Sequence, residues 1–347
     1  MRKLMEKMPA LISLAAALAV LGQATACQAS SPTAWDEVAR MGMGINLGNT
    51  FDAPDGEGTW NPQMAQPGFF DDFKAAGFTH VRLPVTWGKH MQTTPPYAVD
   101  RRFLDRIAEV VSWANQRGMV VVLNAHHEEW FKKDPSAQLP RLEALWRQLA
   151  LRFKSTPESL LVFEVINESD PKFINAVQTT EMNNRILRVI RESNPNRCVI
   201  LGAVGDNADR LLNELQVPKD PYVIATYHCY DPWFFVCGEP RNKDDATWGT
   251  DAQKVDYLRT MDRIKTWSDR NKTPVYLGEW GTSVKCDAKS RLEYYRFVPA
   301  QAAQRGFSNA IWDDGGDMLI YDRAARRWNV DVLKAVFAKP GNHLHGP

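Results

Sequence analysis

Short apolar runs alternate with amphipathic segments along most of this chain. Runs bounded by turn residues, as expected for strands buried on both faces, begin near Gly42, Thr79, Val120, Leu161, Cys198, Tyr222, Val275 and Ser308. Between them, apolar residues at helical spacing (103–114, ended by Arg117-Gly118, then 142–149 and 186–190) predict helices. Strands alternating with helices are typical of an α/β protein with a parallel sheet.

Eight such strands predict a (β/α)8 TIM barrel, a single catalytic domain over residues 36–338. Residues 27–35 and 339–347 are expected to be short tails. No linker or change of composition divides the chain. A doubly wound open sheet is the alternative, but the Gly44-x-x-x-Gly48 spacing does not match the phosphate-binding turn such a sheet usually carries.

Residues 1–26 are predicted to be a signal peptide. Arg2, Lys3 and Lys7 precede an apolar run over 10–22, and small residues follow at 24–26. That run is short for a bilayer span, and no other stretch is apolar enough for one. The protein is therefore expected to be secreted or periplasmic. Lipoprotein anchoring at Cys27, directly after the small residues, is the alternative.

Charge, tryptophan content and cysteine spacing indicate which classes of ligand the protein can bind. The formal net charge is +1, and no run of Lys and Arg interleaved with aromatic residues suggests nucleic-acid binding. Twelve Trp residues suit the apolar faces of uncharged sugars. No Cys-x-x-Cys or His-x-x-x-His spacing suggests a metal. Cys198 is predicted to be a buried thiol, and Cys237 and Cys286, on neighbouring loops of an exported barrel, are predicted to form a disulfide.

Two apolar strands end in a carboxylate. Glu168 closes the run over 161–169, and Glu279 closes the run over 274–281. Taken alone, each could be a solvated loop acid or a helix cap. A carboxylate at the mouth of a buried strand is nevertheless costly without partners or a task. Two of them suggest acid/base and nucleophile work on one bond, at the carboxyl ends where barrels carry their chemistry.

Most of the other strands also end in polar or aromatic groups. These are Asn46, Asn49 and Asp52, then Arg82, then His126 and His127, then Asn167 beside Glu168, then His228 and Tyr230, and finally Trp312, Asp313 and Asp314. A single histidine on a strand is more often a core residue, but so many polar strand ends together predict a site. Asp313, Asp314 and Asp317 surround Gly315-Gly316, which indicates a turn more than a metal cluster.

These residues resemble glycoside hydrolase family 5, the family of many β-1,4-glucanases. The matching segments, in the family's order, are Gly44-Ile-Asn-Leu-Gly-Asn-Thr-Phe-Asp-Ala, Val81-Arg-Leu-Pro-Val-Thr-Trp, Phe163-Glu-x-x-Asn-Glu, His228-x-Tyr230 and Leu277-Gly-Glu-Trp-Gly. The resemblance implies Glu168 as acid/base and Glu279 as nucleophile. It implies supporting roles for Arg82, His126, Asn167, His228 and Tyr230, with Trp312 under the sugar. Ser169 departs from the family, which usually has Pro there.

The chemistry of these groups agrees with such roles. Retention of configuration needs two carboxyl groups about 5–5.5 Å apart. Arg82 and the Tyr230 hydroxyl can hold Glu279 ionised. Glu168, beside that negative charge, is then expected to have a raised pKa and to stay protonated. Asn167 is suited to bind the sugar 2-OH, while His126 and His228 are expected to orient their neighbours or to form core hydrogen bonds.

Several further side chains are candidates for sugar binding. Asn49, Asp52 and His127 are expected on the non-reducing side of the cleft, unless they only cap loops. Trp233 and Trp248 fall in the long loop after the sixth strand and could stack leaving-group sugars. Trp60 could do so on the other side. Simple packing is the alternative for all three tryptophans.

Together these features predict a monomeric, cofactor-free retaining endo-β-1,4-glucanase acting on cellulose-type or mixed-linkage glucan. One alternative keeps the mechanism and changes the polymer to β-mannan or xyloglucan, since loops decide the substrate on a shared fold. Another alternative is a non-catalytic carbohydrate-binding barrel.

Overall fold

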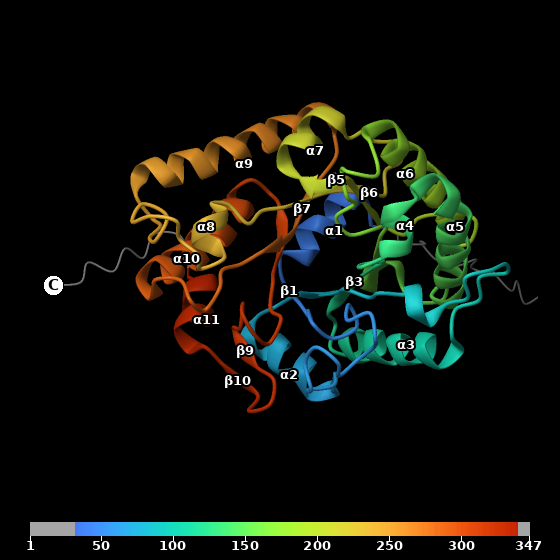
Figure 1. Cartoon of the computed structure of the whole chain (residues 1–347), viewed down its shortest axis with the longest axis horizontal. Coiled ribbons are helices and arrows are strands. Elements are labelled where there is room, and N and C mark those ends of the chain that lie inside the picture. The colour runs from blue at the N-terminus through green and yellow to red at the C-terminus, as the bar shows by residue number, and fades with distance from the viewer. Residues whose placement is uncertain (1–31, 339–347) are drawn as a thin grey trace, which may run out of the picture. The chain divides into compact units, whose positions relative to one another are not determined.

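Eight parallel strands close into a barrel in the computed structural model, which describes residues 32–338. Each strand pairs with the next in sequence, and β8 returns to β1 (Figure 1). The strands are β1 (Met43–Asn46), β2 (His80–Leu83), β3 (Val120–Asn124), β4 (Leu161–Glu164), β5 (Val199–Asn207), β6 (Val223–His228), β7 (Val275–Trp280) and β8 (Ser308–Ile311). This confirms the predicted (β/α)8 barrel, and each predicted strand begins within one residue of the observed start.

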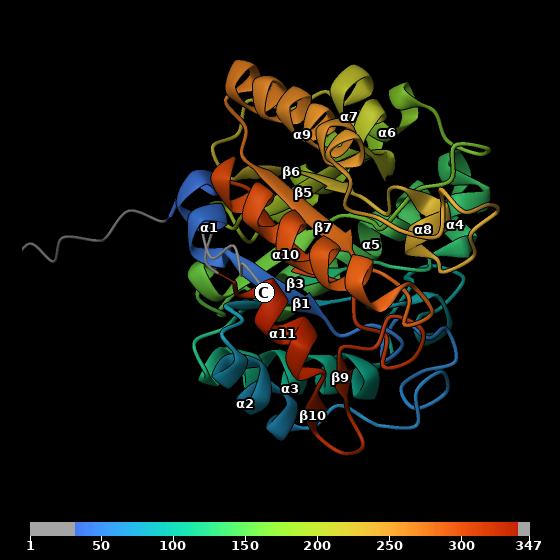
Figure 2. The same cartoon turned by 90° about the vertical axis from the view of Figure 1, so that its left-hand side faces the viewer.

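Helices cover the outside of the barrel, and the first of them closes its lower end (Figures 1 and 2). They are α1 (Ala34–Met41), α2 (Pro67–Ala76), α3 (Arg101–Gln116), α4 (Glu129–Lys133), α5 (Pro135–Arg152), α6 (Ala176–Arg191), α7 (Ala208–Glu214), α8 (Trp233–Val236), α9 (Asp251–Asn271), α10 (Ala288–Gln304) and α11 (Val330–Val336), with 3-10 turns at Gly88–His90 and Glu158–Leu160. A small antiparallel pair, β9 (Tyr321–Asp322) and β10 (Arg327–Trp328), follows β8. The predicted helices correspond to α3, α5 and α6. α1 begins two residues before the predicted start of the domain.

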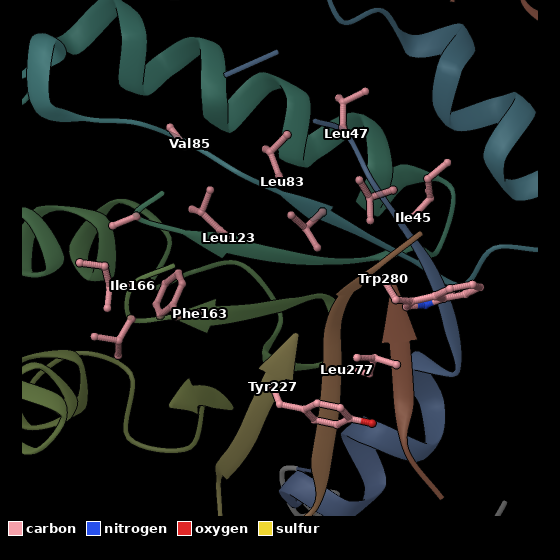
Figure 3. Packing of buried hydrophobic residues seen from close by; sticks show 14 of the residues in the cluster. Ile45, Leu47, Leu83, Val85, Leu123, Phe163, Ile166, Tyr227, Leu277 and Trp280 are labelled. Carbon is pink, nitrogen blue, oxygen red and sulfur yellow. The ribbon is translucent and has the colours of Figure 1, made fainter. Parts of the chain in front are cut away.

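Side chains that alternate along each strand divide the core in two. Outward residues such as Leu83, Leu123 and Phe163 lie side by side on neighbouring strands (Figure 3) and pack against the helices. Phe163, for example, meets Trp146 of α5 edge-on, with ring centroids 5.3 Å apart. Inward residues of the lower barrel form a second cluster, which Val38 and other residues of α1 close from below. The barrel is thus packed through its centre, as this fold requires.

The upper part of the barrel interior is polar instead. Asn46, Arg82, Asn124 and Glu164 occupy inward positions of β1 to β4 at the carboxyl end, and all four are buried. Because the strands are parallel, their carboxyl ends meet on one side of the barrel. These four side chains therefore form the floor beneath the candidate site.

The cysteines differ in part from expectation. Cys198 is a buried free thiol, as predicted. The predicted disulfide is wrong, because Cys237 and Cys286 are both free thiols. The Cys286 thiol instead donates to the carbonyl oxygen of Phe235 at 2.9 Å.

Some features predicted from the sequence fall outside residues 32–338. These are the signal peptide at 1–26, Cys27 and the C-terminal tail at 339–347. Within the described range, none of the helices combines the length and the apolar character needed to cross a bilayer.

Candidate active site

Glu168 and Glu279 come together at the carboxyl end of the barrel. Glu168 follows β4, and Glu279 lies near the end of β7. One carboxylate oxygen of each, with one ring nitrogen of His228, all lie within 4.8 Å of one another. The two acids, 111 positions apart in sequence, are therefore close enough to act on a single bond.

Two donors hold the carboxylate of Glu279. Nη1 of Arg82 donates to its Oε1 at 2.5 Å, and the Tyr230 hydroxyl donates to its Oε2 at 2.9 Å. Glu279 is buried, so these bonds replace the water that its negative charge would otherwise have. Both partners are those predicted from the sequence, and together they fix the direction of the Glu279 carboxyl group.

Arg82 is at the centre of the polar floor. Its guanidinium also donates to Glu164 through Nε at 2.8 Å and through Nη2 at 2.5 Å, to Asn46 at 3.0 Å and to Asn167 at 2.8 Å. The five N–H donors of an arginine are thereby all used. Burial lowers the pKa of Arg82, but the charges of Glu164 and Glu279 outweigh it, and the pKa lies well above its usual value. Arg82 is permanently charged and fixed in place.

Glu168 is paired with His228. Nδ1 of His228 lies 2.7 Å from Oε1 of Glu168, and the Glu168 side chain is 41% exposed toward the open end of the barrel. Burial lowers the pKa of His228, but the negative charges of Glu279 and Glu168 outweigh this effect and raise it to about 9. Burial raises the pKa of Glu168, but the hydrogen bond and the charge of His228 outweigh this effect, so the pKa of Glu168 lies below its usual value.

This corrects the expectation that the pKa of Glu168 is raised. The sequence could not show that a cationic His228 lies against Glu168 and offsets the negative charge of Glu279. The two groups hold one proton between them at neutral pH, with the proton on the His228 side of the hydrogen bond. The glycine at 278 makes room for this ring, since a Cβ there would lie 2.7 Å from Nε2 of His228.

The side-chain amide of Asn167 is hydrogen-bonded through its oxygen, whereas its nitrogen is available to substrate. Its Oδ1 accepts from Arg82, and its backbone N–H donates to the carbonyl of Ala125. Among residues 32–338 nothing accepts from its Nδ2 group, which remains a donor beside Glu168. This arrangement suits the predicted contact with a sugar hydroxyl.

His126 lies against the ring of Trp312. The two rings are nearly parallel at 14°, with centroids 5.9 Å apart. Nδ1 of His126 lies 3.1 Å from Nδ2 of Asn124, whose Oδ1 accepts from the backbone of Val85. Burial lowers the pKa of His126 well below its usual value, so the ring is neutral. With Nδ1 accepting from Asn124, the proton is on Nε2.

The candidates after β1 and β3 have different environments. Asn49 is half-buried with φ of 52°, and His127 is half-buried with its ring edge-on to Trp60, which is 49% exposed. Asp52 is fully buried and accepts the backbone N–H groups of Asn49 at 2.9 Å and Thr50 at 2.7 Å. Its expected contact with substrate is therefore replaced by loop capping, and burial raises its pKa to about 6.

The two tryptophans after β6 also differ from each other. Trp233, in α8, is 58% exposed and remains a candidate sugar platform. Trp248 is only 5% exposed, and its ring packs against Tyr294 at 4.9 Å and Phe297 at 5.3 Å. The expected sugar-binding role of Trp248 is wrong, since the ring is buried among aromatic side chains of the core.

Two groups in residues 32–338 bring three possible metal ligands within 4.8 Å of one another. They are Asp52 with His126 and His127, and Glu168 with His228 and Glu279. In the first group both Asp52 oxygens already accept backbone N–H groups. In the second, Arg82 and Tyr230 hold Glu279 and His228 holds Glu168. Asp313 accepts three backbone N–H groups and pairs with Arg323, which agrees with the turn expected there.

Sequence reasoning assigned no role to Glu164 or Asp206. The sequence could have predicted an ion pair for Glu164, because a carboxylate at an inward position of an apolar strand needs a cation such as Arg82. Asp206 is a buried acid at the end of β5 whose Oδ2 accepts the backbone N–H of Glu168 at 2.8 Å. Its contact depends on a local turn of the backbone that no residue pattern revealed.

Comparison with known proteins identifies the family of this chain. The family model described as Cellulase (glycosyl hydrolase family 5) matches residues 43–317. Endoglucanase H of Acetivibrio thermocellus is 43% identical over 323 residues, which cover 90% of this chain and 35% of that protein. Endoglucanase B of Clostridium cellulovorans is 31% identical over 304 residues, 82% of this chain and 68% of that protein. The chain thus spans only about a third of the length of the first of these relatives.

A solved structure shows the same fold. The crystal structure of the endoglucanase Cel5A from Thermotoga maritima matches with a TM-score of 0.83 and 34% identity. The match covers 88% of this chain and 99% of that one.

Proposed function

Because this chain belongs to glycoside hydrolase family 5, we propose that it is a retaining endo-β-1,4-glucanase that cleaves cellulose-type or mixed-linkage glucan. The observation that carries the proposal is the placement of the Glu168 and Glu279 carboxylate oxygens within 4.8 Å. This spacing suits direct attack on the sugar, whereas an inverting enzyme needs about 6.5–9.5 Å between its carboxyl groups to fit a water molecule.

In the first step, the carboxylate of Glu279 attacks the anomeric carbon. Arg82 and Tyr230 orient it and leave its charge available. As the bond from that carbon to the leaving oxygen breaks, the oxygen takes the proton held by the Glu168–His228 pair. The result is a glycosyl ester on Glu279 and a shortened glucan with a free hydroxyl group.

In the second step, Glu168 acts as a base. It removes a proton from water, and the water oxygen attacks the anomeric carbon and releases the Glu279 carboxylate. Two inversions return the starting β-configuration. The free amide group of Asn167 can bind the sugar 2-OH, an interaction that strengthens in the transition state. Trp312, held against His126, can support the sugar face.

The experiment is a product analysis on carboxymethylcellulose, barley glucan, xyloglucan and mannan side by side. We expect reducing ends from the first two, with a rapid fall in viscosity that marks internal cutting, and β-anomer as the first product by proton NMR. A preference for xyloglucan or mannan would move the substrate to that alternative. No reducing ends from any β-glycan would support the binding-barrel alternative, and α-anomer appearing first would refute retention.

We also propose that the protein is exported and acts as a monomer. Export rests on the basic, apolar and small-residue pattern of residues 1–26. Mass spectrometry of the mature protein tests it: a chain beginning at Cys27 without lipid indicates cleavage alone, whereas a lipid-bearing Cys27 indicates anchoring. Light scattering of the mature protein tests the monomer.

A further inference from the structure

Asp206 fixes the backbone at the residue proposed as acid/base. It is buried at the end of β5, and its Oδ2 accepts the backbone N–H of Glu168 at 2.8 Å. Glu168 itself has φ of 34°, a left-handed conformation that non-glycine residues rarely adopt. Such a conformation persists where the surroundings over-determine it, and it is most often found at functional sites.

The Glu168 side chain has little packing to hold it. It is 41% exposed, and its only described side-chain partner is His228. Ser169 follows Glu168 in this turn. Its hydroxyl accepts the backbone N–H of Gly205 at 3.4 Å, a second bond between the ends of β4 and β5. The direction of Glu168 therefore depends on its backbone as well as on His228.

The end of β5 is shaped to deliver the Asp206 carboxylate. Gly205 and Asp206 both have positive φ, 68° and 45°, and the pairing of β5 with β6 shifts register between Gly202 and Asn207. This turn folds the Asp206 side chain back over Gly202. A Cβ at position 202 would lie 1.7 Å from Oδ1 of Asp206, so only glycine admits the carboxylate.

We propose that Asp206 is a positioning residue for Glu168, whose backbone it holds so that the Glu168 carboxyl group faces the leaving oxygen. This inference rests on the proposed function. Asp206 acts through the Glu168 peptide N–H and does not touch substrate. Its removal therefore impairs proton delivery and water activation, and leaves attack by Glu279 in place.

The predicted signature is dependence on the leaving group. A glycoside of a poor leaving group needs the proton from the Glu168–His228 pair, whereas a dinitrophenyl glycoside leaves without it. Misplacing a catalytic group by about 1 Å can cost about 100-fold in rate. We expect Asp206→Ala to lower kcat/KM by about 10- to 100-fold on methylumbelliferyl cellobioside, whose leaving group is less acidic than dinitrophenol, and on glucan. On dinitrophenyl cellobioside the change should stay within about 3-fold.

Three further variants complete the experiment. Gly202→Ala should give the same dependence on the leaving group, because its Cβ displaces the Asp206 carboxylate while Asp206 itself remains. This variant provides the test if Asp206→Ala does not fold. Asp206→Asn keeps an oxygen that can accept the Glu168 N–H and should restore wild-type leaving-group dependence. Asp209→Ala, which removes an exposed acid two residues beyond Asn207, is the matched control and should behave as wild type.

The inference is overturned if folded Asp206→Ala and Gly202→Ala lose activity equally on both leaving-group classes, or lose none. Asp206→Asn behaving like Asp206→Ala would also overturn it, because the hydrogen bond would then not be what matters. The proposed function is judged separately on the wild-type protein. If wild type releases no reducing ends from any β-glycan, the function fails before any variant is compared.

Discussion

Replacing Glu164 by Gln tests how far the polar floor depends on its buried ion pair. Glu164 is fully enclosed and accepts two hydrogen bonds from Arg82, at 2.8 and 2.5 Å, and one from Asn124 at 3.2 Å. Burial raises the pKa of Glu164, but Arg82 outweighs it and holds the carboxyl ionised. Gln has nearly the same shape, so the substitution removes the charge and turns one acceptor into a donor facing Arg82.

Removing one partner of a buried ion pair lowers the free energy of unfolding by about 3–5 kcal/mol. Arg82 keeps Glu279 as a second charge partner, and Gln still accepts one hydrogen bond, so we expect the lower end, about 3 kcal/mol. Unfolding entropy of about 2.1 cal/mol/K per residue over about 300 residues gives about 0.6 kcal/mol per kelvin. Glu164→Gln should therefore lower Tm by about 5 °C.

The matched control is Glu192→Gln. Glu192 also accepts two hydrogen bonds from one arginine, Arg147, at 3.1 and 3.0 Å, but both side chains are about half exposed. Exposed pairs contribute about 0–1 kcal/mol, so Tm should change by less than about 2 °C. Calorimetry of both variants is the assay. Equal and small shifts would refute the reasoning, since burial of the Arg82–Glu164 pair would then carry no stability.

Two further predictions concern pH and the tryptophans. The proton of the Glu168–His228 pair is lost as pH rises through about 9, so kcat should fall there, and His228→Asn should move this alkaline limb to lower pH. Because the pKa of His228 in the folded protein exceeds its ordinary value of 6.5, the stabilising contribution of His228 is full below about 6.5 and is lost as pH rises through about 9. Urea unfolding at several pH values measures this contribution. Trp248→Ala should cost about 3–5 kcal/mol of stability, because it empties a core site. Trp233→Ala should leave Tm unchanged and raise KM for soluble glucan. If instead Trp248→Ala raised KM without loss of stability and Trp233→Ala lowered Tm, Trp248 would be the sugar platform.

The barrel and the pair of acids could be predicted because simple rules determine both. Apolar runs of strand length, separated by helical periodicity, locate the eight strands to within one residue. Parallel strands bring their carboxyl ends together, so the residues that end those strands meet in space. The barrel therefore brings Glu168, Glu279, Arg82, Tyr230 and His228 to one end, and the expected contacts of Glu279 with Arg82 and Tyr230 follow from that arrangement.

What could not be predicted depends on side-chain direction and local backbone conformation. The pKa of Glu168 depends on which way the His228 ring points. Trp248 and Asp52 lie in loops, where the sequence does not distinguish a buried side chain from one facing the cleft. Asp206 reaches Glu168 only because Gly205 and Asp206 adopt left-handed conformations beside Gly202.

The proposed division of labour between the two acids is tested most directly by azide rescue of two variants. Glu279→Ala cannot form the glycosyl ester, so its turnover should be abolished. Azide can then enter the vacated space and attack the anomeric carbon once, which gives an α-glycosyl azide. Glu168→Ala should still form the ester from an aryl glycoside with an acidic phenol, and should lose about 10²–10⁴-fold on natural glucan.

Azide attacking that ester inverts the configuration a second time. Proton NMR of the azide products from the two variants is thus the deciding measurement. We predict the α-glycosyl azide from Glu279→Ala and the β-glycosyl azide from Glu168→Ala. The opposite pair of anomers would exchange the two roles, and wild-type activity in both variants would show that the chemistry takes place elsewhere.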